Sequence, residues 1–486
     1  MSAFADALND ETPYQPNLEP TGTAMGNEQG QQPAHIIQTG GPVRQQTESD
    51  LGNALLFVAQ YGALLRFVMA WGVWLVWRGT HWEKDDTGEV FRRVKACMRA
   101  LRDRAFDVGN LTDQQRLLKF ATKSQSRVSI DNTIKLAQTE PGVVVTPAQL
   151  DSDQWVLNCQ NGTLDLRTGN MREHRREDLH TKIVPANFNT TATCPQWLKF
   201  LNRITGGDAE LMFFLKKAVG YSLTGDTSEQ CLFYLFGLGR NGKSVFLEII
   251  FYLFGKYAKR ISSESLMVKQ NGGGIPNDIA MLVGARLVVS SEVEEGAKLN
   301  ETRVKELTGG DTVTARFLHQ EYFEFVPALK PWICGNHKPV IRGTDLGIWR
   351  RIRLIPFTVT IPESEIDPHL TDKLRQELPG ILAWAVQGCL AWQREGLKPP
   401  RVVVEATAAY RSESDLIGQF LDECCVLAPA AETSATVIYT RYKAWAETNG
   451  TRPITSSMLT RKLVERGIQT RRSSGTWFIG ISVPAF

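Results

Sequence analysis

The segment GLGRNGKS, residues 237–244, has the spacing G-x-x-x-x-G-K-[ST] of a phosphate-binding loop. Its glycines let backbone N–H groups approach phosphate oxygens closely, and a helix that starts there favours bound anions. Lys243 would reach the β- and γ-phosphates of ATP, and the Ser244 hydroxyl would ligate Mg²⁺. We therefore predict an ATP and magnesium site with contacts from Gly237, Leu238, Gly239, Arg240, Asn241, Gly242, Lys243, Ser244 and Val245.

Such a site also needs a carboxylate at the end of a neighbouring strand, where it holds the metal and polarises the attacking water. The apolar run at residues 287–289 is followed by Glu292, with Glu294 and Glu295 close behind. We predict Glu292 as a metal ligand and catalytic residue, and Glu294 as a second catalytic candidate. The alternative is a solvated acidic loop, which stays open above all for Glu294 and Glu295.

Two later motifs supply further polar groups to the same chemistry. The strand candidate PALKPWICGN ends at Asn336, which could contact the γ-phosphate or its water; alternatively Asn336 only opens the turn before HKP. GIWRRIRLIPF then contains Arg350, Arg351 and Arg353. One of these three arginines is predicted to stabilise the charge of phosphoryl transfer, often from a neighbouring subunit, while the others pair with acids or line a DNA channel.

The segment between the second and third strand candidates reads as a β-hairpin. It runs KELTGGDTVTARFLHQEYFEFVP, with two β-type runs joined by a short turn. Lys305, Arg316 and the tip residue His319 would grip DNA phosphates if the hairpin pointed into a central pore. The competing interpretation is a surface hairpin with solvated charges.

These groups require an α/β scaffold to hold them. An apolar run at residues 231–236 precedes the glycines, an apolar helix candidate at 244–254 follows them, and the pattern alternates to about residue 360. We therefore predict an α/β core over residues 205–360. With 486 residues, of which 42% are hydrophobic, about three domains are expected.

Bulk composition excludes some classes of protein and is silent on others. A net charge of +3 is too small to indicate a partner, so a DNA-binding surface must be local. The eight cysteines form no C-x-x-C pair and no histidine pair has ligand spacing, which argues against a zinc site. Scattered thiols without a signal peptide fit a reducing cytoplasm.

Upstream of the core, residues 1–48 are rich in Gly, Gln, Pro, Thr and Asn and are expected to form a disordered tail. Residues 49–204 are expected to form an α+β module with a strand–turn–strand element, WVLNCQNGTLDLRTGNMREH. The apolar stretch 54–77 is long enough to suggest a membrane span. Because Arg66 lies in its middle, we predict a buried helix and strand, and no membrane partner.

Downstream, we expect a helical linker over residues 361–413 and a winged-helix domain over 414–486. ATVIYTRYKAWAET and SSMLTRKLVERG read as two helices, the second capped by Ser456 or Ser457, and RRSSGTWFIGISV reads as a strand pair. From residue 441 onward there are eight basic residues and two acidic ones. Duplex DNA contact is predicted for Arg461, Lys462, Arg471 and Arg472; the alternative is a winged helix that makes only protein contacts.

The motifs GLGRNGKS, RLVVSSEVEEG, KELTGGDTVTARFLHQEYFEFVP, ICGNHKP and GTDLGIWRRIRLIPF occur in one order and at close to one spacing. Together they resemble the phage and plasmid primase-helicase family, which includes the poxvirus primase-helicase and has a superfamily three helicase motor. The resemblance covers nearly all of the chain after about residue 49. It implies a P-loop core of the AAA+ type, ATP sites between the subunits of a homo-hexamer, and translocation on single-stranded DNA in a central pore.

The resemblance also assigns roles. Residues 237–244 match the family's first motif, Glu292 and Glu294 its acidic second motif, and Lys305 and Arg316 its hairpin. Asn336 matches its sensor, and Arg350 or Arg351 its arginine finger. WRGTHWEKD, NGTLDLRTG and CPQWLKFL look like the module that precedes the motor in this family. Many members begin with a primase domain. The first 48 residues have no D-x-D pair or zinc motif, so we expect no primer synthesis by this chain and a separate primase or initiator as partner.

The sequence thus predicts an ATP- and Mg²⁺-dependent DNA helicase that replicates a phage, plasmid or prophage element in the cytoplasm of a bacterial host. A first alternative is a replication-origin binding factor that uses ATP only to assemble. A second alternative is a packaging or partition ATPase stimulated by duplex DNA. The hairpin and the GIWRR motif argue against both.

Overall fold

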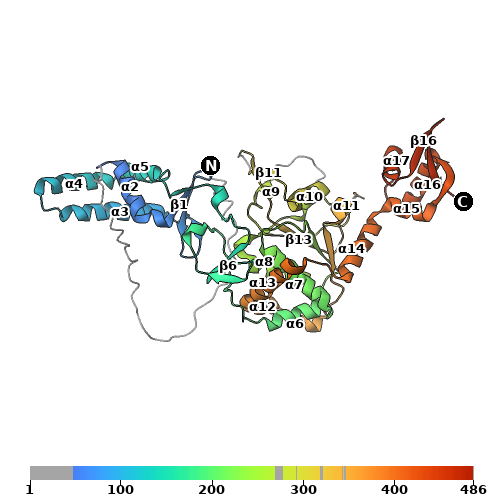
Figure 1. Ribbon diagram of the computed structural model, residues 1–486, viewed down its shortest axis with the longest axis horizontal. Helices are drawn as coiled ribbons and strands as arrows, with labels where there is room; N and C mark the ends of the chain where they lie inside the picture. The colour runs from blue at the N-terminus through green and yellow to red at the C-terminus, as the bar shows by residue number, and fades with distance from the viewer. Residues whose placement is uncertain are drawn as a thin grey trace.

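A five-stranded parallel sheet lies at the centre of the protein, in the order β14-β8-β13-β10-β9 (Figure 1). The computed structural model describes residues 48–268, 277–291, 293–317, 321–341, 343 and 346–484. The strands span Ile352–Pro356 (β14), Leu232–Phe236 (β8), Lys330–Gly335 (β13), Leu287–Ser291 (β10) and Ala258–Arg260 (β9). All five ends point the same way, so the loops that follow the strands meet at one edge.

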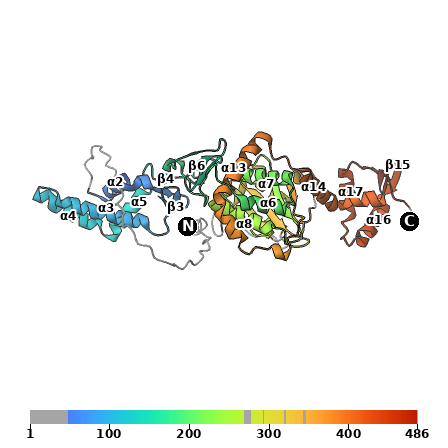
Figure 2. The same cartoon turned by 90° about the horizontal axis from the view of Figure 1, so that it is seen from below.

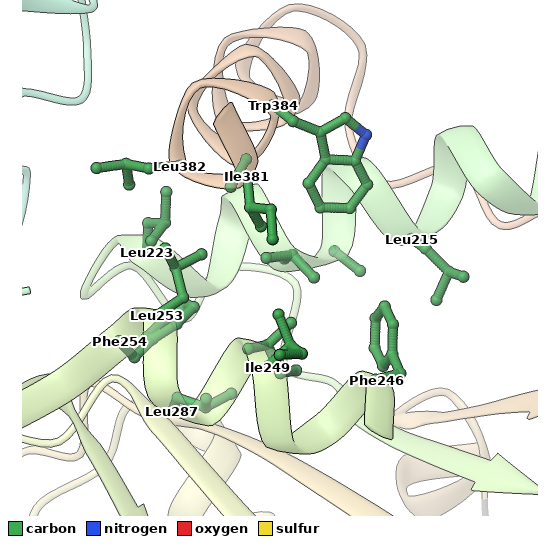
Figure 3. Packing of buried hydrophobic residues seen from close by; sticks show 14 of the residues in the cluster. Leu215, Leu223, Phe246, Ile249, Leu253, Phe254, Leu287, Ile381, Leu382 and Trp384 are labelled. Carbon is green, nitrogen blue, oxygen red and sulfur yellow. The ribbon is translucent and has the colours of Figure 1, made fainter. Parts of the chain in front are cut away.

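Side chains alternate between the two faces of this sheet, and each face has its own core. On one face Phe233, Leu235, Leu287 and Trp332 pack against helices α6 (Pro195–Ile204), α7 (Ala209–Leu223), α8 (Lys243–Phe254), α12 (Leu370–Gln376) and α13 (Leu378–Glu395). Figure 3 shows Ile381, Leu382 and Trp384 of α13 above Phe246, Ile249 and Leu253 of α8. The expectation of a helical linker over 361–413 is therefore wrong for α12 and α13. Their apolar residues belong to the core.

The other face is covered by shorter elements. Tyr234, Val288, Ile333 and Leu354 pack here with residues of α9 (Asn277–Ala280), α10 (Glu301–Gly309), α11 (Leu346–Trp349) and α14 (Arg401–Ser414). The predicted hairpin is present between α10 and β13, with β11 (Val313–Ala315) antiparallel to β12 (Phe323–Phe325). Its tip, including His319, lies outside the described residues. The α/β core predicted for this region is thus confirmed at the level of its strands and helices.

A second unit lies at the N-terminal end of the described chain. It contains α2 (Asp50–Tyr61), β1 (Leu65–Val68), β2 (Val73–Trp77), β3 (Trp82–Lys84), α3 (Glu89–Phe106), α4 (Leu111–Ser124), α5 (Arg127–Ala137) and β4 (Val144–Val145). The apolar stretch 54–77 forms the buried helix and strands that were predicted, and Arg66 donates to the carbonyls of Gly62 and Leu65 and lies over the Trp82 ring. No helix within the described parts of the chain is both long and apolar enough to cross a membrane.

The boundary predicted near residue 204 does not follow the hydrophobic cores. Residues 54–150 form two clusters of their own, whereas the meander β5 (Val156–Cys159), β6 (Gly162–Asp165) and β7 (Asn170–Arg172) shares the core of α7, α8 and α13. Between the predicted N-terminal module's residue 151 and its end at 204, the side chains that contribute to this core include Leu157, Leu164, Val184, Trp197 and Phe200. The part of the chain that shares the core of the central sheet therefore begins near residue 151.

The C-terminal unit has the predicted order of two helices and a strand pair. It comprises α15 (Leu416–Cys424), β15 (Val426–Ser434), α16 (Ala435–Thr448), α17 (Ser456–Glu465), β16 (Gln469–Arg472) and β17 (Thr476–Ser482), with sheet order β15-β17-β16. The predicted cap of α17 is wrong by one residue. Thr455, rather than Ser456 or Ser457, accepts a hydrogen bond from the backbone N–H of Met458.

Candidate nucleotide site

The glycine loop, residues 237–242, joins the end of β8 to the start of α8. Gly239, Arg240 and Gly242 have φ of +101°, +47° and +80°, and left-handed residues of this kind are typical of anion-binding loops. A Cβ on Gly242 would lie 2.4 Å from the side chain of Ile204. Glycine is therefore required there by conformation and by space, and α6 supports the loop from behind.

Lys243 lies at the centre of this loop. Its Nζ donates to the carbonyl of Gly237 (2.6 Å), to Asn241 Oδ1 (2.9 Å) and to Asn336 Oδ1 (3.3 Å). Burial lowers the pKa of the ammonium group from its usual value. The two residues predicted from separate motifs, Lys243 and Asn336, thus lie in direct contact.

The strand register explains this contact. Gly335, the last residue of β13, pairs with Phe236, the last residue of β8, so Asn336 and the glycine loop leave the sheet side by side. Asn241 also donates to the carbonyl of Phe357, just past β14. The loop is therefore bonded to the ends of both strands that flank β8. Ligands of parallel α/β sheets bind at such a position.

A cavity of about 2610 Å³ opens in front of the loop. The predicted residues Gly239 to Val245, Asn336 and Glu294 contribute to its walls, and Ser244 is exposed to it. Glu292, predicted as the main carboxylate, lies outside the described residues. It directly follows Ser291, which pairs with Cys334 at the same edge of the sheet. Glu295 is exposed but does not line the cavity.

The donor groups near the loop suit Mg²⁺ held together with phosphate. Within the described ranges, no group of three His, Cys, Asp or Glu side chains is arranged to hold a metal ion alone. Mg²⁺ usually takes one or two protein oxygens and completes its shell with phosphate and water. The Ser244 hydroxyl and an acidic side chain after β10 fit that requirement.

The three candidate arginines have different surroundings. Arg351 is buried and donates to Thr308 Oγ1 (3.2 Å), the Gly347 carbonyl (2.6 Å) and Gln230 Oε1 (3.3 Å). Arg353 donates to the carbonyl of Arg350. Arg350 is exposed and reaches only Gln230 Oε1 among the contacts given by the described residues. Arg351 is therefore held by three contacts within the chain, whereas the Arg350 guanidinium is exposed and makes a single contact, to Gln230, among the described residues.

The hairpin presents one of its predicted cations on an aromatic ring. The Arg316 guanidinium lies 4.7 Å from the centre of the Tyr322 ring, across the two strands. Lys305 lies on α10, half-buried. His319 cannot be placed because it falls outside the described residues.

The cations predicted to contact duplex DNA lie on the C-terminal unit. Arg461 pairs with Glu465 (3.7 Å), and Arg471 pairs with Glu432 (2.7 Å), both at exposed positions. Arg472 is exposed on β16, and Lys462 lies on α17. Exposed pairs of this kind are worth little and exchange readily with other anions.

Sequence reasoning missed two cations beside the nucleotide site. Arg375 of α12 lines the cavity, pairs with Glu248 (2.9 Å) and lies over the ring of Tyr252 on α8. Lys338, two residues after the sensor candidate, pairs with Glu413 of α14 (2.6 Å). Lys338 belongs to the motif ICGNHKP, but no role was predicted for it there. Arg375 lies in no motif, and the packing of α12 against α8 brings it to the cavity.

Comparison with known proteins shows two regions similar to one family. The family model described as D5 N terminal like matches residues 54–206, and that described as Poxvirus D5 protein-like matches residues 412–468. The chain therefore carries two D5-like regions. A third model, for a family of unknown function, matches residues 235–351, which contain the glycine loop and the arginines of β14.

Curated relatives of this chain come from large DNA viruses. A provisionally named helicase of Acanthamoeba polyphaga mimivirus is 26% identical over 345 residues, covering 66% of this chain and 36% of the relative. A provisionally named helicase of frog virus 3 is 30% identical and covers 54% and 29%. A provisionally named primase of African swine fever virus is 26% identical and covers 75% and 41%. The chain therefore spans about a third of the length of these relatives, and their sources lend no support to the expected bacterial host.

A solved structure shares the fold. The apo structure of the NrS-1 C-terminal region has a TM-score of 0.50 and 11% identity, and the match covers 89% of this chain and 99% of that one. At this identity the likeness concerns the fold alone. The recognition made from the motifs is thus confirmed for the two D5-like regions, and the role suggested by the relatives' names is that of a replication helicase or primase.

Proposed function

We propose that this protein is an ATP-dependent DNA helicase or translocase of replication, with a P-loop core of the AAA+ type and a C-terminal winged helix. The observation that supports it best is the contact of Lys243 with Asn336 at the head of the glycine loop. A phosphate-binding lysine and a polar sensor from the adjacent strand are the pair that such motors need around a γ-phosphate.

Each residue of the site has its own role in binding or hydrolysing ATP in this proposal. Backbone N–H groups of residues 239–244 and the Lys243 ammonium hold the phosphates of ATP, which replace the three oxygens that now accept from Lys243. Mg²⁺ supplies charge neutralisation when bound, through Ser244 and Glu292. Asn336 orients the attacking water, with Glu292 or Glu294 accepting its proton.

Arg350 acts on the site of a neighbouring subunit in a homo-hexamer. Its exposure on α11–β14 and its single contact with Gln230 leave it available to a second copy. Arg316 and His319 of the hairpin segment, together with Lys305 of α10 rather than of the hairpin as predicted, contact single-stranded DNA, and the C-terminal unit contacts duplex DNA. Phosphate contact of this type is independent of sequence and sensitive to salt.

The deciding measurement is ATP hydrolysis with and without single-stranded DNA, on the wild-type chain and on Lys243→Ala. We expect single strands to raise turnover and the variant to lose it, because Lys243 stabilises the transferred phosphoryl group. Lys398→Ala, which removes an exposed lysine that does not line the cavity, is the matched control and should keep turnover. Turnover that stays near background with DNA present would favour the ATP-gated origin binder instead.

A further inference from the structure

Helix α3 has two faces of opposite character. Its inner face is apolar and buried: Val90, Val94, Cys97, Met98, Leu101 and Ala105. Its outer face carries Arg92, Lys95, Arg99 and Arg102, all exposed, which we call the α3 stripe. At 3.6 residues per turn these four cations lie within an arc of ~80° and along ~15 Å of the helix.

The charges of the stripe are left without acidic partners. Arg92 donates to the carbonyl and hydroxyl of Thr87, and no ion pair given for the described residues reaches Lys95, Arg99 or Arg102. Members of the stripe are three or four residues apart, where like charges on a helix repel each other. Such an arrangement is stabilised by an anion from outside the helix.

Two aromatic rings accompany the stripe. Phe91 and Phe106, near the two ends of α3, are 47% and 56% exposed. Exposed aromatic rings beside cations offer surfaces on which bases stack. Proteins that bind single strands combine cations, which contact the phosphates, with such rings. A duplex hides the faces of its bases, so rings of this kind add little to duplex binding.

The stripe lies far from the nucleotide site. The hairpin of α3 and α4 projects from the N-terminal unit at the end of the molecule opposite the C-terminal unit (Figures 1 and 2). The central sheet lies between these two ends. Binding at α3 would therefore be separate from the contacts of the β11–β12 hairpin and of the C-terminal unit.

We propose that the α3 stripe, together with Phe91 and Phe106, is a binding site for single-stranded nucleic acid. The cations contact successive phosphates and the rings stack on bases at either end. The site works without nucleotide, so it does not depend on the hydrolytic function proposed above.

The test measures binding of fluorescein-labelled dT20 to the full chain by fluorescence anisotropy, without nucleotide, over a series of salt concentrations. The stripe variant replaces Arg92, Lys95, Arg99 and Arg102 by Gln. The control variant replaces four other exposed cations of the same unit, Lys119, Lys123, Arg127 and Lys135, by Gln, so the change in net charge is the same. Lys243→Ala is measured in parallel, and its affinity should equal that of the wild type.

We expect the stripe variant to bind dT20 at least 10-fold more weakly at 0.1 M salt, with a salt slope shallower by about 2 to 3 units, since each phosphate contact contributes about 0.7. The control variant should lose less than 3-fold, and Phe91→Ala with Phe106→Ala should weaken binding with an unchanged slope. A labelled rU20 strand that behaves like dT20 shows a site that reads phosphates and bases but not the sugar, and one that binds more weakly shows a site selective for DNA.

Three results would overturn the proposal. Equal losses in the stripe and control variants would mean that net charge alone attracts the strand. Unchanged dT20 affinity with an altered oligomeric mass, measured by light scattering, would assign the stripe to a contact between subunits. Unchanged dT20 affinity with lost binding to phosphatidylserine vesicles would assign it to a membrane surface.

Discussion

Arg350 and Arg351 are neighbours in the sequence but face different surroundings. Arg351 is 7% exposed and bonds to α10, to α11 and to Gln230, whereas Arg350 is exposed. We expect Arg351→Ala to destabilise the core by about 2–3 kcal/mol, because Thr308 and a carbonyl lose a buried charged donor. Urea unfolding should show this loss, and Arg350→Ala should unfold like the wild type.

Arg350, unlike Arg351, is expected to affect catalysis rather than the stability of the fold. We expect Arg350→Ala to hydrolyse ATP at least about 10²-fold more slowly, which is a modest loss for a residue that stabilises phosphoryl transfer from a neighbouring subunit. Mixing it with Lys243→Ala should restore part of the turnover, because some interfaces then combine an intact loop with an intact arginine. Wild-type turnover by Arg350→Ala would remove it from the mechanism, and no rescue on mixing would place its effect within one subunit.

At the scale of elements, the contact between α7 and α13 leaves no room for side chains at two glycines. A Cβ on Gly220 would lie 2.1 Å from the backbone nitrogen of Cys389, and one on Gly388 would lie 2.0 Å from the carbonyl of Lys216. Overpacking typically costs 1–3 kcal/mol where side chains can yield. Here the obstacle is backbone, so the two helices would have to separate.

We therefore expect Gly220→Ala to lower the thermal midpoint of the core by several degrees and to reduce ATP turnover with it, since α7 and α13 cover α8. Gly109→Ala is the control, because its Cβ would meet nothing within 4 Å. The two variants can be compared by near-UV circular dichroism during heating. Equal midpoints for both variants would contradict the close contact.

The elements around the nucleotide site were largely predictable, and the reason is local. β8, β10 and β13 are apolar runs that end at polar or glycine residues, so sequence alone placed the loop and Asn336 at one edge. The membership of α13 in the core was missed, although the run LPGILAWAVQGCLAWQ is apolar on all sides, as buried helices are. The position of Arg375 depends on the packing of α12 against α8, a contact between distant segments that no local pattern encodes.

At the scale of the whole molecule, the N-terminal unit joins the segment that packs on the central sheet near Asp151. The Asp151 carboxylate accepts from Lys182 Nζ (2.8 Å), from the backbone N–H of Thr181 (2.9 Å) and from the Thr181 hydroxyl. Burial alone would raise the pKa of Asp151, but the Lys182 ammonium and the Thr181 bonds outweigh it and lower the pKa to about 2. The folded carboxyl is therefore more acidic than the unfolded one, near 3.9.

Because the pKa of Asp151 is lower in the folded than in the unfolded chain, its contribution to stability decreases as the pH falls. The contribution of Asp151 to stability is complete above about pH 4 and is lost as pH falls toward about 2, because the unfolded chain binds the proton first. Asp151→Asn keeps the left-handed backbone at φ +49°, which Asn tolerates, and removes the charge. We expect it to be less stable than the wild type by about 2 kcal/mol at pH 6, with the difference shrinking between pH 4 and pH 2 in urea titrations. A difference that stays constant with pH would show that the ion pair is not its cause.

The C-terminal unit has a core that is its own. Helix α14 connects this unit to the central sheet domain, and the Lys338–Glu413 pair lies at the end of that helix. The core of the unit lies within residues 417–481 and includes Ile417, Phe420, Tyr442, Leu459 and Phe478. A fragment of residues 412–486 should therefore fold alone with a cooperative thermal transition. If the unit is a winged helix that binds duplex DNA, the fragment should bind a labelled duplex with strong salt dependence.

Replacing Arg461, Lys462, Arg471 and Arg472 by Gln should then weaken duplex binding by the fragment at least 10-fold, since each lost phosphate contact lowers the salt slope by about 0.9. The same changes in the full chain should leave turnover stimulated by single strands intact, because the glycine loop and the hairpin lie in a different unit. A folded fragment without duplex affinity would instead assign this unit to protein contacts. In that case the C-terminal unit would not bind duplex DNA for the proposed helicase, and loading of the helicase onto a duplex would depend on another protein.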